Sequence, residues 1–177
     1  MKAKFLIAYA TRVGSTIEIA EAIGKVLTEW GADVDIRSTS ERIDVEDYDA
    51  VILGSAIRVG KWLPEAVDFL KTHRAALSTI PTAFFVACMT LHDDTDENRK
   101  LVLSYLDPVL EEVPEVRPVS IGLFAGEVNP TKLSLPIRLF IRVNKVPRGD
   151  FRRWDDIRRW ASSIAPTLLG EPELLYP

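Results

Sequence analysis

The sequence predicts an α/β fold: one doubly wound parallel sheet of five strands in the order 2-1-3-4-5, helices on both faces, and an insert before the last helix. Apolar segments of strand length alternate along the whole chain with segments of helical periodicity. The predicted strands are nearly continuous apolar runs, which is typical of strands buried on both faces. With 177 residues, 47% of them hydrophobic, the chain can bury one full core, and residues 1–177 are expected to form a single domain.

In the first half of the chain, strands are predicted at residues 5–9, 34–36 and 49–54. The first strand ends in a turn-like Thr-Arg-Val-Gly-Ser-Thr segment, and a helix follows it. The apolar residues of this helix recur at helical spacing: Ile17, Ala20, Ile23, Leu27 and Trp30. Gly31 is expected to end it. Pro64 favours the first turn of a second helix, which should reach about Leu77.

In the second half, strands are predicted at residues 82–89 and 116–124. Asp94, with Glu97 three residues later, can cap a helix that runs to about Leu106. The last helix is expected to begin at Asp150. Its apolar side chains form one stripe: Trp154, Ile157, Ala161, Ile164 and Leu168.

A long segment, residues 127–149, separates the fifth strand from the last helix. Connections of this length are usually functional or carry structure of their own. Pro136 can begin a helix here, with the cations Arg138, Arg142 and Lys145 on one face and the apolar residues Leu139, Phe140 and Val143 on another. Such a helix could lie in a membrane interface through residues 133–146, bind substrate carboxylates, dock a redox partner, or cover the sheet edge with its apolar side.

Charge is unevenly distributed along the chain. Residues 1–131 carry 13 Lys and Arg against 21 Asp and Glu, a net charge of −8. Residues 132–159 carry nine Lys and Arg against three Asp, a net charge of +6. This asymmetry predicts either an anionic partner for the basic part or a solvated basic helix face.

The cysteine content and the lengths of the apolar segments indicate where in the cell the protein is expected. Cys88 is the single cysteine, which excludes an internal disulfide and favours a reducing, cytoplasmic location; we expect Cys88 itself to pack in the core. No segment reaches the ~20 apolar residues that span a bilayer. The short apolar run at the start is better interpreted as the first strand than as a signal peptide.

Ligands of open parallel sheets bind outside the carboxyl ends of the strands. The loops to examine are therefore residues 10–16, 55–63, 89–94 and 125–130. In the first loop, the hydroxyls of Thr11, Ser15 and Thr16 surround Gly14 at the entrance of a helix, and Arg12 adds a charge. Backbone N–H groups and the positive end of the helix dipole make such a turn an anion site.

Several nucleotide-binding classes are excluded. The chain has no Gly-x-x-x-x-Gly-Lys-[Ser/Thr] sequence, so it is not a P-loop NTPase. Gly14 stands alone rather than in Gly-x-Gly-x-x-Gly, which argues against a dinucleotide fold. A phospho-receiver domain would have an acceptor Asp at the end of the third strand, where this chain has Gly54 and Ser55. No cluster of His, Cys and Asp has metal-ligand spacing, so no metal is expected.

The first loop resembles the phosphate loop of flavodoxins. The resemblance covers residues 7–20, Ile-Ala-Tyr-Ala-Thr-Arg-Val-Gly-Ser-Thr-Ile-Glu-Ile-Ala, with one departure at Ala8, where a larger apolar residue is usual. The second loop, Gly-Ser-Ala-Ile-Arg-Val-Gly-Lys at residues 54–61, is similar to that of the menaquinone-dependent protoporphyrinogen oxidases, flavodoxin-like enzymes of haem synthesis. The similarity extends from residue 4 to about 168. Val59 and Lys61 stand where those enzymes tend to have an aromatic residue and a His.

The resemblance implies FMN as the cofactor and assigns the following residues to its site. Thr11, Arg12, Val13, Gly14, Ser15 and Thr16 would hold the phosphate. Ser55, Ala56, Ile57, Arg58, Val59, Gly60 and Lys61 would lie along the isoalloxazine, with Gly60 as a peptide that can rotate. Met89, Thr90, Leu91 and His92 would cover the other ring edge, with Ala125 and Gly126 nearby. Arg58 or Lys61 would stabilise an anionic reduced ring, or both are exposed to solvent.

Two further residues have open roles, and no catalytic residue is assigned. His92 is a candidate for proton transfer or a solvated loop residue, and Trp62 is expected to contact the flavin partially.

The function predicted from these motifs is that of an FMN-dependent oxidoreductase of the protoporphyrinogen-oxidase-like group, passing electrons from an organic donor to a quinone or similar acceptor. The alternative is a flavodoxin-type electron carrier that serves a partner redox protein. The segment 127–149 distinguishes them, because an enzyme would use it as a lid over its pocket and a carrier has little need of one. A module that binds FMN poorly is a third alternative. No nucleic-acid partner is expected, the oligomeric state is open, and contact with a membrane face is considered only through the basic segment.

Overall fold

A computed structural model describes residues 1–171 of the chain. Its central sheet has the order β2-β1-β3-β5-β6, and these five strands are parallel, which confirms the predicted order 2-1-3-4-5. A short strand, β4, pairs antiparallel with β3, and β7 and β8 form a separate two-stranded sheet. The strands are β1 Lys4–Ala10, β2 Asp33–Ser38, β3 Ala50–Arg58, β4 Lys61–Trp62, β5 Thr82–Ala87, β6 Ile121–Phe124, β7 Glu127–Val128 and β8 Gly149–Asp150.

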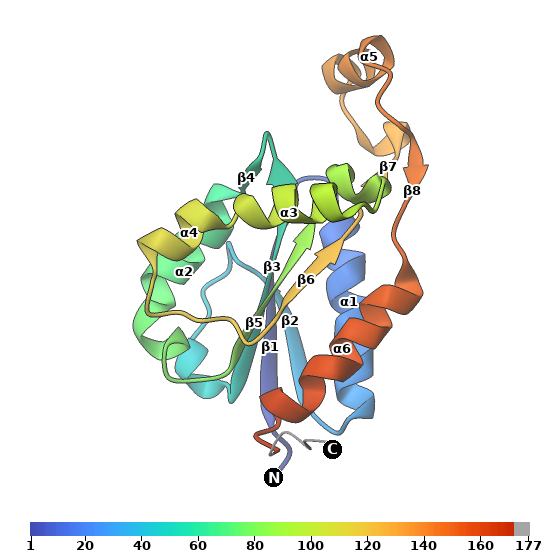
Figure 1. Ribbon diagram of the computed structural model, residues 1–177. Helices are drawn as coiled ribbons and strands as arrows, with labels where there is room; N and C mark the ends of the chain where they lie inside the picture. The colour runs from blue at the N-terminus through green and yellow to red at the C-terminus, as the bar shows by residue number, and fades with distance from the viewer. Residues whose placement is uncertain (172–177) are drawn as a thin grey trace.

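Helices cover both faces of the sheet (Figure 1). They are α1 Ser15–Glu29, α2 Pro64–Leu77, α3 Asp96–Ser104, α4 Asp107–Glu112, α5 Leu135–Val143 and α6 Trp154–Leu168. Short 3-10 turns lie at Val45–Asp47, Met89–His92 and Pro130–Lys132. One apolar cluster joins the sheet to α2, α3 and α4, and a second joins its other face to α1 and α6. Alternate residues of β1, β3 and β5 contribute to the two clusters, as the predicted double burial requires, whereas the edge strand β2 is partly exposed and contributes to one cluster only.

The apolar side chains of α6 all pack against the core. Ile157, Ala161, Ile164 and Leu168 are buried against the sheet and α1, and Trp154 packs beside them. The helix begins at Trp154 and not at the predicted Asp150. Gly149 and Asp150 instead pair with β7, so the chain is still extended there.

Three other predicted boundaries were wrong. The fifth strand begins at Ile121 rather than 116, because Pro118 has no N–H to donate and pairing with β5 starts only at Val119, whose N–H donates to Thr82 O at 2.7 Å. Thr95, not Asp94, caps α3, its hydroxyl accepting from Asn98 N at 3.1 Å. β3 runs through Arg58, so part of the expected loop 55–63 is a hairpin.

The segment 127–149 carries its own structure, as expected from its length. It leaves the sheet at β7, forms a 3-10 turn and α5, and returns at β8, so that α5 stands beyond the carboxyl end of the sheet, apart from the body (Figure 1). It therefore does not cover the sheet edge, which removes that alternative. Lys145 lies past the end of α5 with φ +50°, so only Arg138 and Arg142 of the three predicted cations belong to the helix.

Gly54 marks a close approach between strands at the centre of the sheet. A Cβ atom at this position would lie 1.9 Å from the Phe85 ring, which is itself fully buried. Gly54→Ala should therefore destabilise the fold by about 3 kcal/mol or prevent folding, measured by urea denaturation. Gly24→Ala in α1 is the matched control. Its Cβ would lie 3.0 Å from Ile36 Cδ1, 3.4 Å from Ile7 Cδ1 and 3.5 Å from Val34 Cγ1, all side-chain methyl groups. Helix propensity favours Ala, so a comparable loss there would contradict the steric argument.

Candidate cofactor and substrate site

The turn between β1 and α1 is shaped by Gly14. Its φ of +91° places it in the left-handed region, where L side chains are strained, and it serves as the N-cap of α1 without a side-chain cap bond. Gly14 N donates to Thr11 Oγ1 at 3.1 Å, which leaves the Thr11 hydroxyl hydrogen available to another acceptor. Ile17 N donates to Gly14 O at 3.1 Å, whereas the N–H groups of Ser15 and Thr16, which begin the helix, have no intrahelical partner. The turn thus presents donors and a positive dipole end to an anion.

Thr16 supplies the observation that tests this assignment. Its side chain is fully buried, yet its Oγ1 has no hydrogen-bond partner among residues 1–171. Buried hydroxyls are rarely left unpaired, because the loss of hydration is costly. Ser15, the preceding residue, is also buried. An unpaired hydroxyl beside uncapped N–H groups fits the phosphate monoester of FMN.

Arg12 is engaged outside the anion site. Its guanidinium forms an ion pair with Glu65 at the start of α2, with N–O separations of 2.6 and 3.0 Å. The Arg12 hydrogen bond lowers the pKa of Glu65 from its ordinary value. The charge of Arg12 is therefore shared with a carboxylate in this structure.

The β3–β4 hairpin is held together by Ser55. The Ser55 side chain is fully buried, and its Oγ donates to Ala56 O and accepts from Leu63 N at 3.1 Å. It therefore does not enter the cavity as a cofactor ligand through its side chain. It fixes instead the strand that carries Ala56, Ile57 and Arg58.

The hairpin turns at Val59 and Gly60, both of which have positive φ, +51° and +69°. Arg58 and Lys61 pair across the turn, so the connection is a two-residue hairpin loop with φ > 0 at both central positions. This loop favours Asn-Gly, and Val there is strained because it is β-branched. Val59 is also 93% exposed, so no packing compensates for the strain.

Val59→Asn is expected to stabilise the protein by about 1 kcal/mol, because Asn tolerates the left-handed conformation and no buried contact is lost. Urea denaturation measures the change. Val119→Asn is the control, an exposed Val without positive φ, and it should give no gain. A loss of stability in the Val59 variant would contradict the strain argument.

The loop after β5 contributes less to the site than expected. Met89 lines the cavity, but Leu91 is buried in the core. His92 Nδ1 lies 2.9 Å from Met89 O, and its ring packs edge-on against Phe151 with centroids 5.7 Å apart. Trp62 is buried, packs edge-on against Phe84 at 5.3 Å, and lines the hollow beside Gly60 and Lys61 instead of the main cavity. Cys88 is buried, as predicted.

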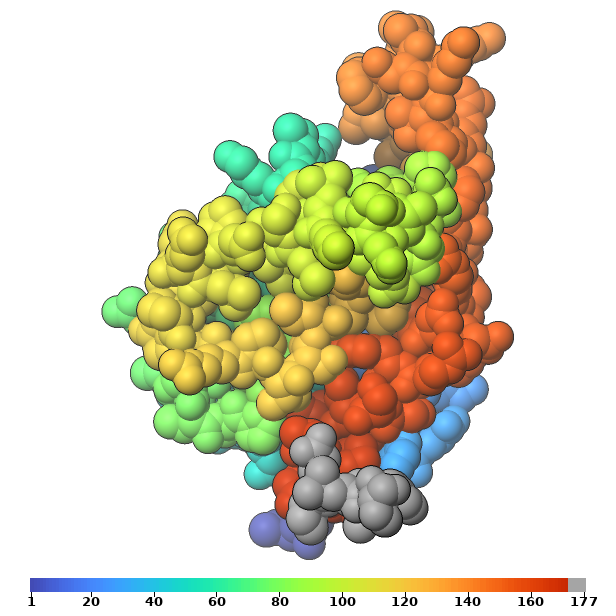
Figure 2. All heavy atoms as spheres, viewed as in Figure 1, coloured from blue at the N-terminus to red at the C-terminus, as the bar shows by residue number. Residues whose placement is uncertain are grey.

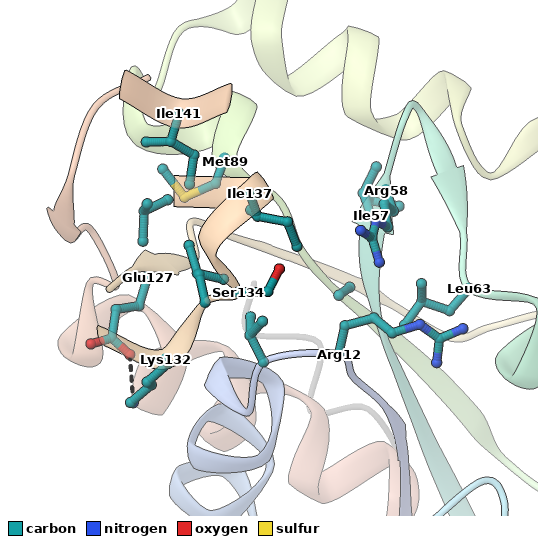
Figure 3. A pocket seen from close by; sticks show the side chains of 14 residues that line it. Arg12, Ile57, Arg58, Leu63, Met89, Glu127, Lys132, Ser134, Ile137 and Ile141 are labelled. Atoms are coloured by element: carbon teal, nitrogen blue, oxygen red, sulfur yellow. Dashed lines mark hydrogen bonds and ion pairs between the residues drawn. The ribbon is translucent and has the colours of Figure 1, made fainter. Parts of the chain in front are cut away.

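A cavity of about 410 Å³ opens at the carboxyl end of the sheet (Figure 3). Ile57 and Arg58 of β3 enter it from one side, and Ser134 and Ile137 of the insert enter from the other (Figure 3). Its full lining is Arg12, Val13, Ala56, Ile57, Arg58, Leu63, Met89, Glu127, Val128, Lys132, Leu133, Ser134, Ile137 and Ile141. The walls are thus mainly apolar, with a few polar groups, as in many small-molecule sites.

The structure brings six of the predicted site residues into this lining: Arg12, Val13, Ala56, Ile57, Arg58 and Met89. Gly60 and Lys61 instead line a separate hollow beside Tyr105. Ala125 is buried, and Gly126 lies next to the phosphate loop, where an added Cβ would be 3.8 Å from Ser15 Oγ.

Sequence reasoning missed the insert side of the cavity. Leu133, Ile137 and Ile141 recur at intervals of four, a spacing in the sequence that is typical of one helix face, although α5 itself contains only Ile137 and Ile141. Lys132 also lines the cavity and binds Glu127 at 3.0 Å. No group of three or more His, Cys, Asp or Glu in the described part of the chain could hold a metal ion.

The flavodoxin domain matches residues 6–153, most of the length of this chain. The chain belongs to the flavodoxin family. Solved flavodoxins share the fold: one from the domain Archaea has a TM-score of 0.58 at 17% identity, covering 93% of this chain and 98% of its own. Flavodoxin 2 from Bacillus cereus has a TM-score of 0.53 at 23% identity, covering 93% of this chain and 99% of its own.

Sequence relatives carry functional names. A protein of Leishmania major named protoporphyrinogen IX dehydrogenase [quinone] is 29% identical over 96% of this chain and 78% of its own length. The protein of that name from Escherichia coli K12 is 36% identical, over 46% of each chain. An NAD(P)H dehydrogenase (quinone) of Methylocella silvestris is 28% identical over 51% of this chain and 59% of its own.

These matches confirm the predicted flavodoxin-like family and fold, and they support an oxidoreductase that uses FMN. The unpaired Thr16 hydroxyl and the glycine turn at residue 14 are the features of this chain that fit the cofactor.

Proposed function

We propose that this flavodoxin-family protein is an FMN-dependent oxidoreductase that takes electrons from an organic donor and passes them to a quinone. The observation that carries the proposal is the wall that the insert contributes to the cavity. Leu133, Ile137 and Ile141 face Ile57 across the space next to the phosphate loop. A carrier that exchanges electrons at its surface has little use for such an enclosure, whereas an enzyme needs one to orient a substrate and exclude water.

The chain's own residues have distinct parts in this activity. Thr11, Thr16 and the uncapped N–H groups of α1 bind the phosphate. Ala56, Ile57 and the insert isoleucines offer flat apolar walls to the isoalloxazine and an aromatic substrate. FMN, when bound, supplies the two-electron redox chemistry.

Arg58 is the cation best placed to act on charge in the cavity. It lines the space and forms no ion pair within residues 1–171, unlike Arg12 and Lys132, which bind Glu65 and Glu127. An unneutralised guanidinium stabilises negative charge that develops on a bound ring or holds a substrate carboxylate.

The donor is tested by turnover. FMN-loaded protein is mixed with a soluble quinone analogue and either protoporphyrinogen IX or NAD(P)H, the donors that the names of its relatives indicate. Quinone reduction that depends on one donor supports the enzyme. Stepwise reduction followed by visible absorption tests the alternative, because accumulation of a one-electron-reduced form without turnover of either donor would favour an electron carrier.

We further propose that the insert contacts an anionic membrane, where a quinone is reached. No helix in the described part of the chain is long and apolar enough to span a bilayer. Leu135, Leu139, Phe140 and Val143 of α5 are between 62% and 77% exposed. Residues 128–149 contain no Asp or Glu.

The hairpin tip belongs to the same surface. Figure 2 shows two lobes at one end of the molecule, a larger one from the insert and a smaller one near residue 60. Val59 at the smaller lobe and the four exposed α5 residues are the most exposed large hydrophobic side chains after Met1 in the described chain. Around them, Lys61, Arg142, Lys145 and Arg148 form no ion pair with any residue from 1 to 171. Exposed apolar groups with surrounding cations favour an anionic lipid surface.

A further inference from the structure

Arg152 is a buried cation that neither the cofactor assignment nor the cavity uses. Its side chain is 5% exposed, although it lies just beyond the insert and outside the cavity lining. Charged side chains are almost never buried unless they are paired. Arg152 is paired unusually well, with three carboxylates from three different elements.

The three partners join both ends of the insert to α1. Arg152 Nη2 lies 2.7 Å from Asp150 Oδ2 on β8 and 3.6 Å from Glu127 Oε2 on β7, and Nε donates to Asp150 Oδ1 at 2.8 Å. Nη1 binds Glu18 Oε2, in the first turn of α1. The guanidinium also stacks over the Trp154 ring at 4.6 Å. Arg152 thereby lowers the pKa of Asp150 below its ordinary value.

The same place is where the insert meets the phosphate loop. Phe151 N donates to Gly126 O at 3.2 Å, and a Cβ on Gly126 would be 3.8 Å from Ser15 Oγ. Glu127, bound by Arg152, also binds Lys132 at 3.0 Å, and both of these residues line the cavity. A chain of contacts therefore runs from α1 through Arg152 and Glu127 to the insert wall.

We propose that Arg152 is a positioning residue that clamps the insert to the phosphate loop, so that the lid over the cavity is ordered together with the cofactor site. The inference rests on the proposed function in placing FMN phosphate at the start of α1. Without the cation, Asp150 and Glu18 lose their pairing and Glu127 keeps only Lys132, so repulsion among the three carboxylates separates β7 and β8 from α1. A bound phosphate that orders residues 15–18 therefore also favours closure of the insert. By the reciprocity of such coupling, closure of the insert favours binding of the phosphate.

Limited digestion with trypsin tests the clamp, because the insert offers cleavage sites after Arg138, Arg142 and Lys145. Wild type, Arg152→Gln and Arg152→Lys are compared with and without FMN. Arg158→Gln is the matched control, since it removes an equal charge from an exposed i,i+3 pair with Asp155. Bound FMN is measured in each sample by its absorption.

Without FMN, Arg152→Gln should be cut in the insert at least tenfold faster than wild type, while the body of the fold remains as a resistant fragment. Arg158→Gln should be cut like wild type. Arg152→Lys should fall between them, because an ammonium keeps the charge but not the fork that binds several carboxylates. FMN should slow cleavage severalfold in wild type and Arg158→Gln but not in Arg152→Gln, an effect that loss of stability alone would not produce.

If the insert is cleaved at the same rate in Arg152→Gln and in wild type, Arg152 does not clamp the insert. If FMN protects Arg152→Gln as well as it protects wild type, the clamp is not coupled to the cofactor site. If Arg152→Gln does not fold, Glu18→Gln removes only the link to α1 and should still raise the cleavage rate; an unchanged rate there also overturns the proposal. Failure of wild type to bind FMN would refute the cofactor assignment and leave the FMN-free comparison of cleavage rates intact.

Discussion

Thr16→Val is expected to lower the affinity for FMN by about 10- to 150-fold and to leave the affinity for riboflavin unchanged. The variant keeps the shape of the side chain and removes only the hydroxyl, which is buried without a partner in the phosphate loop. A hydrogen bond to a charged group contributes about 1.5–3 kcal/mol, and each 1.4 kcal/mol is a factor of ten in affinity. Titration of the FMN-free protein with each flavin, followed by flavin fluorescence, measures both constants.

The same variant should change stability in the opposite direction. In the absence of FMN, an unpaired buried hydroxyl is unfavourable, so Thr16→Val should raise the free energy of unfolding by about 1 kcal/mol. Thr82→Val is the matched control, because the equally buried Thr82 hydroxyl lies 3.2 Å from both Leu77 O and Ile80 O. That change should destabilise the fold and leave FMN affinity unaltered. Equal FMN and riboflavin affinities in wild type would remove the phosphate argument altogether.

The sequence was sufficient for the fold because the sheet depends on local, periodic information. Continuous apolar strands such as Thr82–Ala87 are recognisable without partners, and the helix from Pro64 to Leu77 has the predicted bounds. The errors lie where tertiary contacts override local preference. Asp94 has a good capping pattern, but Arg99 and Arg153 bind its carboxylate, and the cap passes to Thr95. Asp150 similarly forms an ion pair with Arg152 and does not begin a helix.

The phosphate loop was predictable because its motif is contiguous, whereas the second wall of the cavity was not. Ile137 and Ile141 reach the site only because β7 and β8 pair and raise α5 above the sheet, a contact between residues more than 20 positions apart. Arg12 is a motif residue whose side-chain partner could not be predicted. Its position in the motif suggested a phosphate ligand, but Glu65, 53 residues away, takes the guanidinium. Side-chain partners distant in sequence decide such roles.

Replacement of Arg138, Arg142 and Lys145 by Glu is expected to abolish binding to anionic vesicles. All three side chains are exposed, and within residues 1–171 no carboxylate pairs with them; Arg138 donates only to the backbone carbonyls of Leu133 and Thr131. Each Lys or Arg near such a surface contributes about 1 kcal/mol. Loss of three such contributions alone lowers partitioning about 150-fold, and the added negative charges lower it further. Co-sedimentation with vesicles containing phosphatidylserine measures the effect.

The matched control replaces Lys100, Arg158 and Arg159 by Glu. These residues are exposed on α3 and α6, away from the insert, and the change in net charge is the same. If the control variant loses vesicle binding equally, net charge alone determines binding, and the insert is not the membrane-binding surface. Binding of wild type should also weaken as salt rises, because exposed charges are screened beyond a Debye length of ~8 Å at physiological ionic strength.

Replacement of Leu139 and Phe140 by Ser separates insertion from simple electrostatic attraction. The two side chains are each 62% exposed, so the change should leave folding and FMN content intact. If α5 buries them in the interface, vesicle binding should fall and its remaining part should become more sensitive to salt, since the apolar contribution is lost. If binding is unchanged, the helix lies outside the hydrocarbon boundary and only its cations contact lipid. If wild type does not sediment with anionic vesicles even at low salt, the membrane proposal is wrong, and the exposed face of α5 belongs to another partner.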